Sequence, residues 1–162
     1  MGDHTETIEI DFDPSAISLE QLLNIFWNNY QPRKDGYGGR QYRSLLLYRN
    51  EKQKDQARCL KHRLEEHLEI AIETEMQPYD QFFLAEEKHQ KYYLKRYKQA
   101  YETVLELFQS HEAFVKSTVA ARLNGFVRGF GTLTELKEEI YFWGLDDHDI
   151  GILKETIKKI KW

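Results

Sequence analysis

The first half of the chain alternates between strand-like and helix-like patterns, and this order limits the folds that are open to it. Alternating or continuous apolar side chains predict strands at 7–12, 41–48 and 70–76. Apolar stripes at helical spacing, each preceded by a capping residue, predict helices at 19–30 and 51–69. This order favours an α+β or α/β sandwich, in which helices cover a mixed sheet.

The first of these strands is expected to be half-buried, with Ile8, Ile10 and Phe12 on one face. Sequential elements usually lie side by side, so we expect it to pair with the strand at 43–48. The same alternation places Glu6 on the apolar face, where burial would raise the pKa of a carboxyl group and create a general acid. The alternative is that the end of the strand leaves Glu6 in solvent.

The second half of the chain has a different character. Apolar side chains recur there at helical spacing as far as the C-terminus. The apolar faces of these helices are too narrow for the helices to be stable alone. We therefore expect a sandwich core over 1–94 and an all-helical extension, packed on it, over 95–162.

Composition excludes several classes of protein. The chain has 27 acidic residues against 23 Lys and Arg, a formal net charge of −4, so we expect no nucleic-acid partner. No apolar run is long enough to span a bilayer, and the first residues lack the pattern of a secretory signal. The single cysteine, Cys59, excludes an internal disulfide and fits a reducing compartment. We expect a cytoplasmic protein with no membrane partner.

Residue types that often carry chemistry receive structural interpretations here. Cys59 lies beside the apolar stripe of its predicted helix and is interpreted as a small buried hydrophobe, not a nucleophile. His62 and His67 are five residues apart, which does not stack two ligands on one helix face, so no metal site is predicted. Four tyrosines are interpreted as core and packing surface and not as a stacking platform: Tyr92, Tyr93, Tyr97 and Tyr101.

Taken in order, several segments resemble the peptide methionine sulfoxide reductase A family. They are His4-Thr5-Glu6, the run from Ile8 to Pro14, Phe26-Trp27, Gln41-Tyr42-Arg43-Ser44, and the run from Phe83 to Tyr92. This resemblance covers residues 2–94. The region 95–162 resembles, less closely, a helical extension of divergent members.

The resemblance implies a two-layer, ferredoxin-like reductase core that needs no cofactor. It also implies attack of a cysteine thiolate on the sulfur of methionine-S-sulfoxide, in oxidised proteins or peptides. A thioredoxin-type reductant then restores the cysteine from its sulfenic acid. By position, the resemblance makes Glu6 the acid and Tyr42 a hydroxyl donor to the sulfoxide oxygen, and it places Tyr37 and His4 at the substrate.

The sequence departs from the family pattern in four places. It contains no Gly-Cys-Phe-Trp segment, which carries the family nucleophile, and no cysteine in its C-terminal part. Tyr37 stands where the family usually has an aspartate, with Asp35 nearby but out of register, and Tyr30 replaces a histidine.

Three interpretations of these departures stay open. In the first, the chain is a reductase truncated at its N-terminus, with Met1 an internal methionine; in the second, it is a non-catalytic module that binds methionine sulfoxide. In the third, the helical half is a protein-interaction surface. We expect no turnover by this chain alone, and self-association through an uncovered sheet edge.

Overall fold

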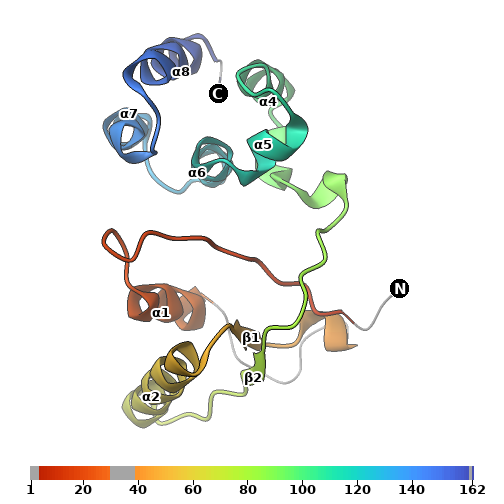
Figure 1. The fold of residues 1–162 in the computed structure, drawn as a ribbon, viewed down its shortest axis with the longest axis vertical. Helices are drawn as coiled ribbons and strands as arrows, with labels where there is room; N and C mark the ends of the chain where they lie inside the picture. Colours follow the sequence, from red (N-terminus) through yellow and green to blue (C-terminus); the bar gives the residue numbers. More distant parts are fainter. Residues whose placement is uncertain (1–3, 30–38, 161) are drawn as a thin grey trace. The chain divides into compact units, whose positions relative to one another are not determined.

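The computed structural model describes residues 4–29, 39–160 and 162 (Figure 1). The chain divides into two compact units, residues 1–83 and 84–162. This division falls before residue 94, where we expected the core to end. The first unit mixes helices with a small sheet and the second is helical, so the predicted α+β class is confirmed.

The first unit is built on a parallel pair of strands joined by a helix. Leu45 pairs with Glu75 and Tyr48 pairs with Pro78, and the helix between the strands returns the chain to the same end of the sheet. The ferredoxin-like topology stays a prediction. The elements of this unit are α1 (Leu19–Asn29), the 3-10 turn η1 (Gly39–Tyr42), β1 (Leu45–Tyr48), α2 (Glu51–Leu68) and β2 (Glu75–Pro78).

Both helices begin where side chains satisfy their first backbone groups. The Gln21 amide donates to the Ser18 hydroxyl at 3.2 Å, and the Gln21 side chain accepts from the Ser18 amide at 2.8 Å. This reciprocal pair is the predicted capping box. Asn50 caps α2 by accepting from the Gln53 amide at 2.9 Å.

The core of the first unit contains a buried chain of polar side chains. The Trp27 indole of α1 donates to the Thr74 hydroxyl at 3.0 Å, and that hydroxyl lies 2.7 Å from the Ser44 hydroxyl. Trp27, Ser44 and Thr74 are all buried. Since Ser44 precedes β1 and Thr74 precedes β2, these hydrogen bonds fix α1 to the edge of the sheet where both strands begin. The apolar core around it comprises Leu23, Trp27, Ala57, Leu60 and Ile72.

The predicted strand at 7–12 is wrong. These residues form no strand, and Ile8 and Ile10 are 84% and 53% exposed. An alternating sequence becomes a strand only when a neighbouring strand supplies backbone partners. Within the described part of the chain, β1 pairs with β2 alone, so the expected pairing with 43–48 is also wrong.

Two other strand predictions are corrected in detail. All four residues of β1 are half-buried and not enclosed on both faces. In a two-stranded sheet β1 is an edge strand, and we had expected a strand at the centre of a larger sheet. The last strand begins at Glu75 and not at 70, and it includes Pro78, which we expected to lie beyond its end. The residues 70–74 instead lead from α2 into the sheet.

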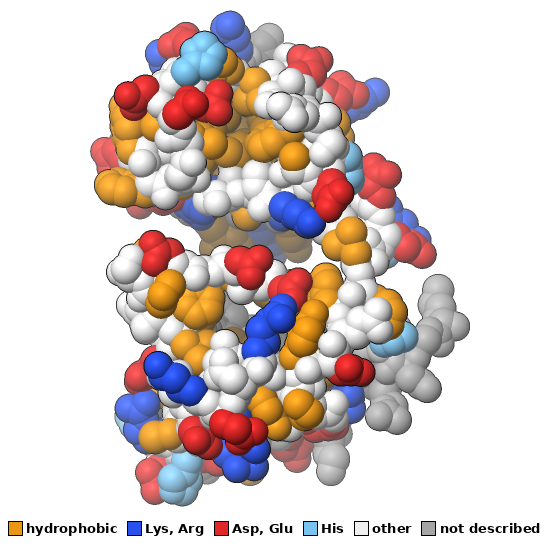
Figure 2. Space-filling view, in the orientation of Figure 1, with side chains coloured by type: hydrophobic (Ala, Val, Ile, Leu, Met, Phe, Trp, Pro, Cys, Tyr) orange, Lys and Arg blue, Asp and Glu red, His pale blue; other side chains and the backbone are white. Residues whose placement is uncertain are grey.

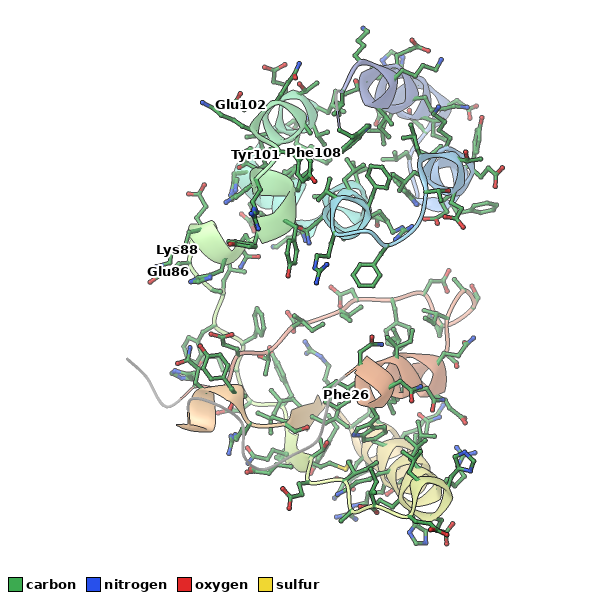
Figure 3. All side chains as sticks on the ribbon, turned by 180° about the vertical axis from the view of Figure 1, so that it is seen from behind. Phe26, Glu86, Lys88, Tyr101, Glu102 and Phe108 are labelled. Atoms are coloured by element: carbon green, nitrogen blue, oxygen red, sulfur yellow. The ribbon has the colours of Figure 1, made fainter. Side chains whose placement is uncertain are left out.

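Helices fill the second unit and surround one apolar interior (Figure 1). Tyr101 and Phe108 lie next to each other in Figure 3, and both pack edge-on against the buried Phe114, with ring centroids 5.4 and 5.6 Å away. The elements are η2 (Glu87–His89), α3 (Tyr92–Lys95), α4 (Lys98–Leu105), α5 (His111–Lys116), α6 (Thr118–Val127), α7 (Leu133–Glu139), η3 (Ile140–Phe142) and α8 (Asp147–Lys159).

Thr132 and Glu135 cap each other reciprocally in a capping box at the start of α7. The helix α6 continues through Asn124 and Gly125 to Val127. Acidic and basic side chains are intermixed over the visible face of each unit (Figure 2). None of the described helices is long and apolar enough to cross a membrane.

Replacing Thr74 by valine is expected to destabilise the first unit by about 2 kcal/mol, because it leaves the buried Trp27 indole N–H without an acceptor. Ser44→Ala is the matched control: it removes one bond of the chain but leaves Trp27 paired, and should cost about half as much. Denaturant unfolding followed at the Trp27 indole resonance measures both. Equal stability of Thr74→Val and the unmodified protein would contradict this role.

Candidate functional site

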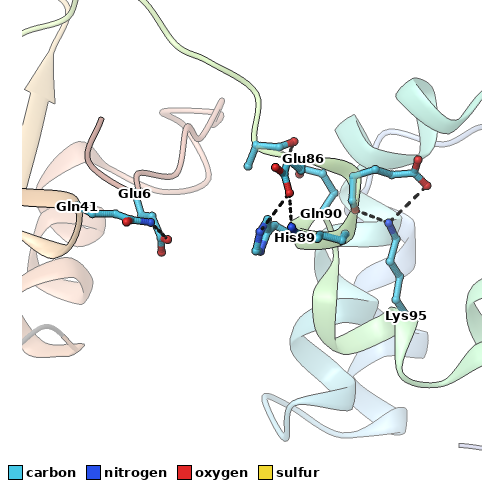
Figure 4. Close-up of polar contacts among 9 residues, drawn as sticks. Glu6, Gln41, Glu86, His89, Gln90 and Lys95 are labelled. Carbon is cyan, nitrogen blue, oxygen red and sulfur yellow. Dashed lines mark hydrogen bonds and ion pairs between the residues drawn. The ribbon is translucent and has the colours of Figure 1, made fainter. Parts of the chain in front are cut away.

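Glu6, one of the two residues expected to act on the substrate, is bonded to Gln41, the residue directly before the other, Tyr42. The Glu6 amide donates to the Gln41 carbonyl at 2.9 Å, and the Gln41 side-chain amide donates to Glu6 Oε1 at 2.7 Å (Figure 4). These two bonds form what we call the Gln41 clamp. Tyr42 follows Gln41 directly at the end of η1, so the clamp holds the carboxylate beside the residue that carries the phenol.

Arg43 joins the same N-terminal segment to the sheet. Its Nε donates to the Thr5 hydroxyl at 2.8 Å, while its Nη1 forms an ion pair with Glu75 Oε2 at 2.8 Å. The side chain of Arg43 is only 21% exposed, so these bonds are partly shielded from water. Glu75 is the first residue of β2. Arg43 therefore connects the segment that contains Glu6 to the sheet.

His4 and Glu9 hold the two ends of this segment. The His4 ring packs against Phe83 with centroids 4.6 Å apart and planes inclined at 55°. Glu9 forms an ion pair with Arg49, just after β1. Residues 5–9 thus follow residues 41–49 through one backbone hydrogen bond and several side-chain contacts, although no strand ladder connects them.

Of the two interpretations of Glu6, the exposed carboxylate is confirmed and the buried general acid is wrong. The segment around Glu6 is not a strand, so no apolar face forms to enclose the side chain. Tyr42 is also exposed, at 45%. An exposed carboxyl group with one oxygen held by Gln41 can present its other oxygen in a defined direction to a small polar ligand.

Tyr37 and Asp35, the two candidates for the family aspartate position, lie outside the described residues, as does Tyr30. Their part in a site stays a prediction from the sequence. Across the described ranges, no three His, Cys, Asp or Glu side chains are grouped so that they could hold a metal ion.

Cys59 is exposed on α2, so its interpretation as a buried hydrophobe is wrong. The side chain faces solvent because Ala57 and Leu60 occupy the inward positions of that turn. One turn further on, a hydrogen bond to Glu20, with a smaller contribution from Cys59, raises the pKa of Arg63. Cys59 therefore lies on a charged surface of α2, and the Gln41 clamp involves other residues.

The sequence did not predict the roles of Gln41 and Arg43. A signal was available, because both residues belong to the quoted segment Gln41-Tyr42-Arg43-Ser44, on either side of the residue that received a role. Three members of that segment each have a specific contact. Gln41 holds Glu6, Arg43 holds Thr5 and Glu75, and the Ser44 hydroxyl shares a buried hydrogen bond with Thr74.

Comparison with known proteins gives two matching family models. Residues 1–123 match the model described as peptide methionine sulfoxide reductase. Residues 110–158 match the model described as the helical domain of selenoprotein methionine sulfoxide reductase A. The two matches overlap and together cover nearly the whole chain.

Similar curated proteins carry the same description. The chain is 41% identical over 148 residues to a peptide methionine sulfoxide reductase of Drosophila melanogaster, which is 90% of this chain and 58% of that protein. It is 32% identical over 135 residues to peptide methionine sulfoxide reductase MsrA 1 of Rhodopirellula baltica, 81% of this chain and 64% of that protein. The chain thus spans less than two thirds of the length of these relatives.

Replacing Gln41 by leucine is expected to loosen the segment around Glu6, because one of the two bonds of the clamp is lost. Hydrogen exchange at the Glu6 amide should accelerate roughly two- to tenfold, in line with the net worth of one hydrogen bond. The matched control is Gln77→Leu, which removes another glutamine-to-carboxylate bond, of 3.1 Å to Glu75. Unchanged exchange in Gln41→Leu, or equal acceleration in both variants, would argue against the clamp.

Proposed function

Because the chain belongs to the peptide methionine sulfoxide reductase family, we propose that its Gln41 clamp presents Glu6 and Tyr42 to the oxygen of a methionine-S-sulfoxide. The clamp is the observation that carries this proposal, since it holds an exposed carboxyl group beside the residue with an exposed phenol. The Tyr42 hydroxyl donates a hydrogen bond to the sulfoxide oxygen, and Glu6 delivers a proton to it. His4, at the start of the same segment, contributes to the substrate-binding surface, together with Tyr37.

The proposed reaction needs a thiolate in addition to these two groups. The thiolate donates an electron pair to the sulfoxide sulfur, and the sulfur–oxygen bond breaks as Glu6 protonates the oxygen. The released oxygen then bonds to the cysteine sulfur, and the new bond between the two sulfurs breaks, so the cysteine becomes a sulfenic acid and the substrate leaves as methionine. A thioredoxin-type dithiol then reduces the sulfenic acid to a thiol, releases water and becomes a disulfide.

Cys59 is not proposed as that nucleophile. A reactive cysteine requires an electropositive site next to the groups that hold the substrate, whereas Cys59 lies on the outer face of α2. The 162 residues contain no other cysteine. We infer that this chain alone binds methionine sulfoxide in oxidised proteins or peptides, that its reduction requires a thiolate these 162 residues do not supply, and that it acts in the cytoplasm, where thiols stay reduced. Self-association through an uncovered sheet edge stays a prediction.

A second candidate function is a non-catalytic binding module. The observation in its favour is that the Gln41 clamp is complete in a chain whose single cysteine lies elsewhere. Such a module recognises oxidised methionine through the same Glu6 and Tyr42. It differs from the first candidate in requiring no thiolate from any source.

A peptide with one methionine-S-sulfoxide is expected to bind, and Glu6→Gln or Tyr42→Phe should each weaken binding roughly five- to tenfold through loss of a hydrogen bond. The R-sulfoxide and unoxidised peptides should bind more weakly. Glu66→Gln and Tyr79→Phe are matched controls, because they alter the same residue types outside the clamp and outside the segment that carries Glu6. Titration calorimetry measures all of these. Failure of the unmodified chain to bind the S-sulfoxide would overturn the proposal.

No reduction of the same peptide is expected when the chain is mixed with dithiothreitol or a thioredoxin system. Chromatographic assay of methionine formation, with and without Cys59→Ser, tests this. The two proteins should give the same background rate. Turnover that disappears in Cys59→Ser would show that Cys59 is the nucleophile and that its assignment above is wrong.

A further inference from the structure

Three tyrosines that we interpreted as core are exposed on the second unit. Tyr92 is 52% exposed, Tyr93 37% and Tyr97 40%. Only Tyr101 of the original four packs inward, against Phe114. Exposing three large rings in one short stretch loses apolar burial that folding would otherwise gain, and clustered exposed rings are typical of recognition surfaces.

The two segments around these tyrosines contain no acidic residue. Residues 88–101 and 113–134 have neither Asp nor Glu, in a chain with 27 of them, yet they carry five and three Lys or Arg respectively. The segments meet where α3 packs on α6: the Asn124 side chain accepts from the Tyr93 and Leu94 amides at 3.0 and 3.1 Å. Two stretches of sequence that have cations and no acids therefore meet in the helical unit, although the whole chain is negative.

Most Lys and Arg side chains of these segments form ion pairs within the unit. The ones that do not are available to bind a partner. Ion pairs commit Lys88 to Glu86, Lys95 to Glu87, Lys98 to Glu102, Lys116 to Glu112 and Arg122 to Glu139. By contrast, neither Arg96 nor Arg128 forms an ion pair with any carboxylate that the structure describes. Both are exposed.

One available arginine, Arg128, lies next to an exposed ring, and the other, Arg96, follows two of the rings in sequence. The Arg128 guanidinium is 5.3 Å from the centre of the Tyr93 ring, and the Tyr93 and Tyr92 rings meet edge-on at 5.4 Å. Arg96 follows Tyr92 by one helical turn, and its amide donates to the Tyr93 carbonyl at 3.2 Å. We define Tyr92, Tyr93, Arg96, Tyr97 and Arg128 as the tyrosine–arginine surface.

We propose that the tyrosine–arginine surface docks an acidic segment of another polypeptide. Tyrosine and arginine are the residue types enriched at the energetic centres of protein interfaces, where acidic residues are depleted, and this composition matches the surface. Two uncommitted guanidinium groups specify carboxylates, because they bind them in a bidentate fashion. A nucleic acid is less well matched, since most of the cations that would follow its phosphates are committed to ion pairs.

The environment of the half-buried Lys91 is consistent with an anionic partner. It has a left-handed backbone conformation (φ 50°) directly before Tyr92, and burial lowers the pKa of its amine. A bound carboxylate nearby would favour the charged form of this lysine. The proposal does not depend on the methionine sulfoxide function, because every residue of the surface belongs to the second unit.

Fluorescence anisotropy with a labelled oligo-glutamate peptide tests the proposal on the full chain. We expect binding that weakens with added salt, and a loss of roughly tenfold or more for Arg96→Glu combined with Arg128→Glu, the scale of interface hot spots. Tyr92→Ser combined with Tyr97→Ser should also weaken binding. Matched controls elsewhere on the same unit are Lys159→Glu and Tyr141→Ser, which should bind like the unmodified chain.

Three results would overturn the proposal. They are no binding of the peptide, equal losses in the surface variants and in their controls, and binding of oligothymidylate or of anionic lipid vesicles in place of the peptide. All substituted side chains are exposed, and unchanged denaturation midpoints verify that the variants remain folded.

Discussion

The first unit depends on one buried contact between three polar side chains. Thr74 receives the Trp27 indole N–H and shares a hydrogen bond with Ser44, so one hydroxyl joins α1 to the start of both strands. A two-stranded sheet gains little stability from its own ladder. It needs a helix on its face, and the geometry of this hydrogen bond specifies where that helix lies. Apolar packing alone would hold α1 less specifically, because it has no direction.

The candidate site is arranged from this fixed point outward. Ser44 is the buried end of a run in which Arg43 holds the N-terminal segment and Gln41 holds Glu6. Within these four residues, the contacts pass from the buried core at Ser44 to Gln41, which holds the exposed carboxyl group of Glu6. A site built this way needs no pocket to orient Glu6, because the orientation comes from the rigid sheet through covalent and hydrogen bonds.

Helices were predicted from the sequence more accurately than strands or the site. The limits of α1 and α2 and the capping boxes at Ser18 and Thr132 depend on local contacts, which a sequence pattern reports directly. Ile8 and Ile10 alternate as a strand should, but a strand requires a distant partner that no local pattern reveals. The exposures of Glu6, Cys59 and Tyr92 depend likewise on what packs beside them. Gln41 and Arg43 were missed because their roles are contacts with distant residues.

Residues 4–9 are attached by one backbone hydrogen bond and by side chains, without a strand ladder. Each tie is a partly exposed polar contact of modest strength, so the segment can open while the sheet and its helices remain intact. Opening separates Glu6 from Tyr42 and leaves the fold unchanged. Apparent affinity for any ligand that needs both groups is then the intrinsic affinity multiplied by the closed fraction. Ionic strength sets that fraction through Arg43 and Arg49, so the occupancy of the site responds to salt at concentrations that leave the global stability unaffected.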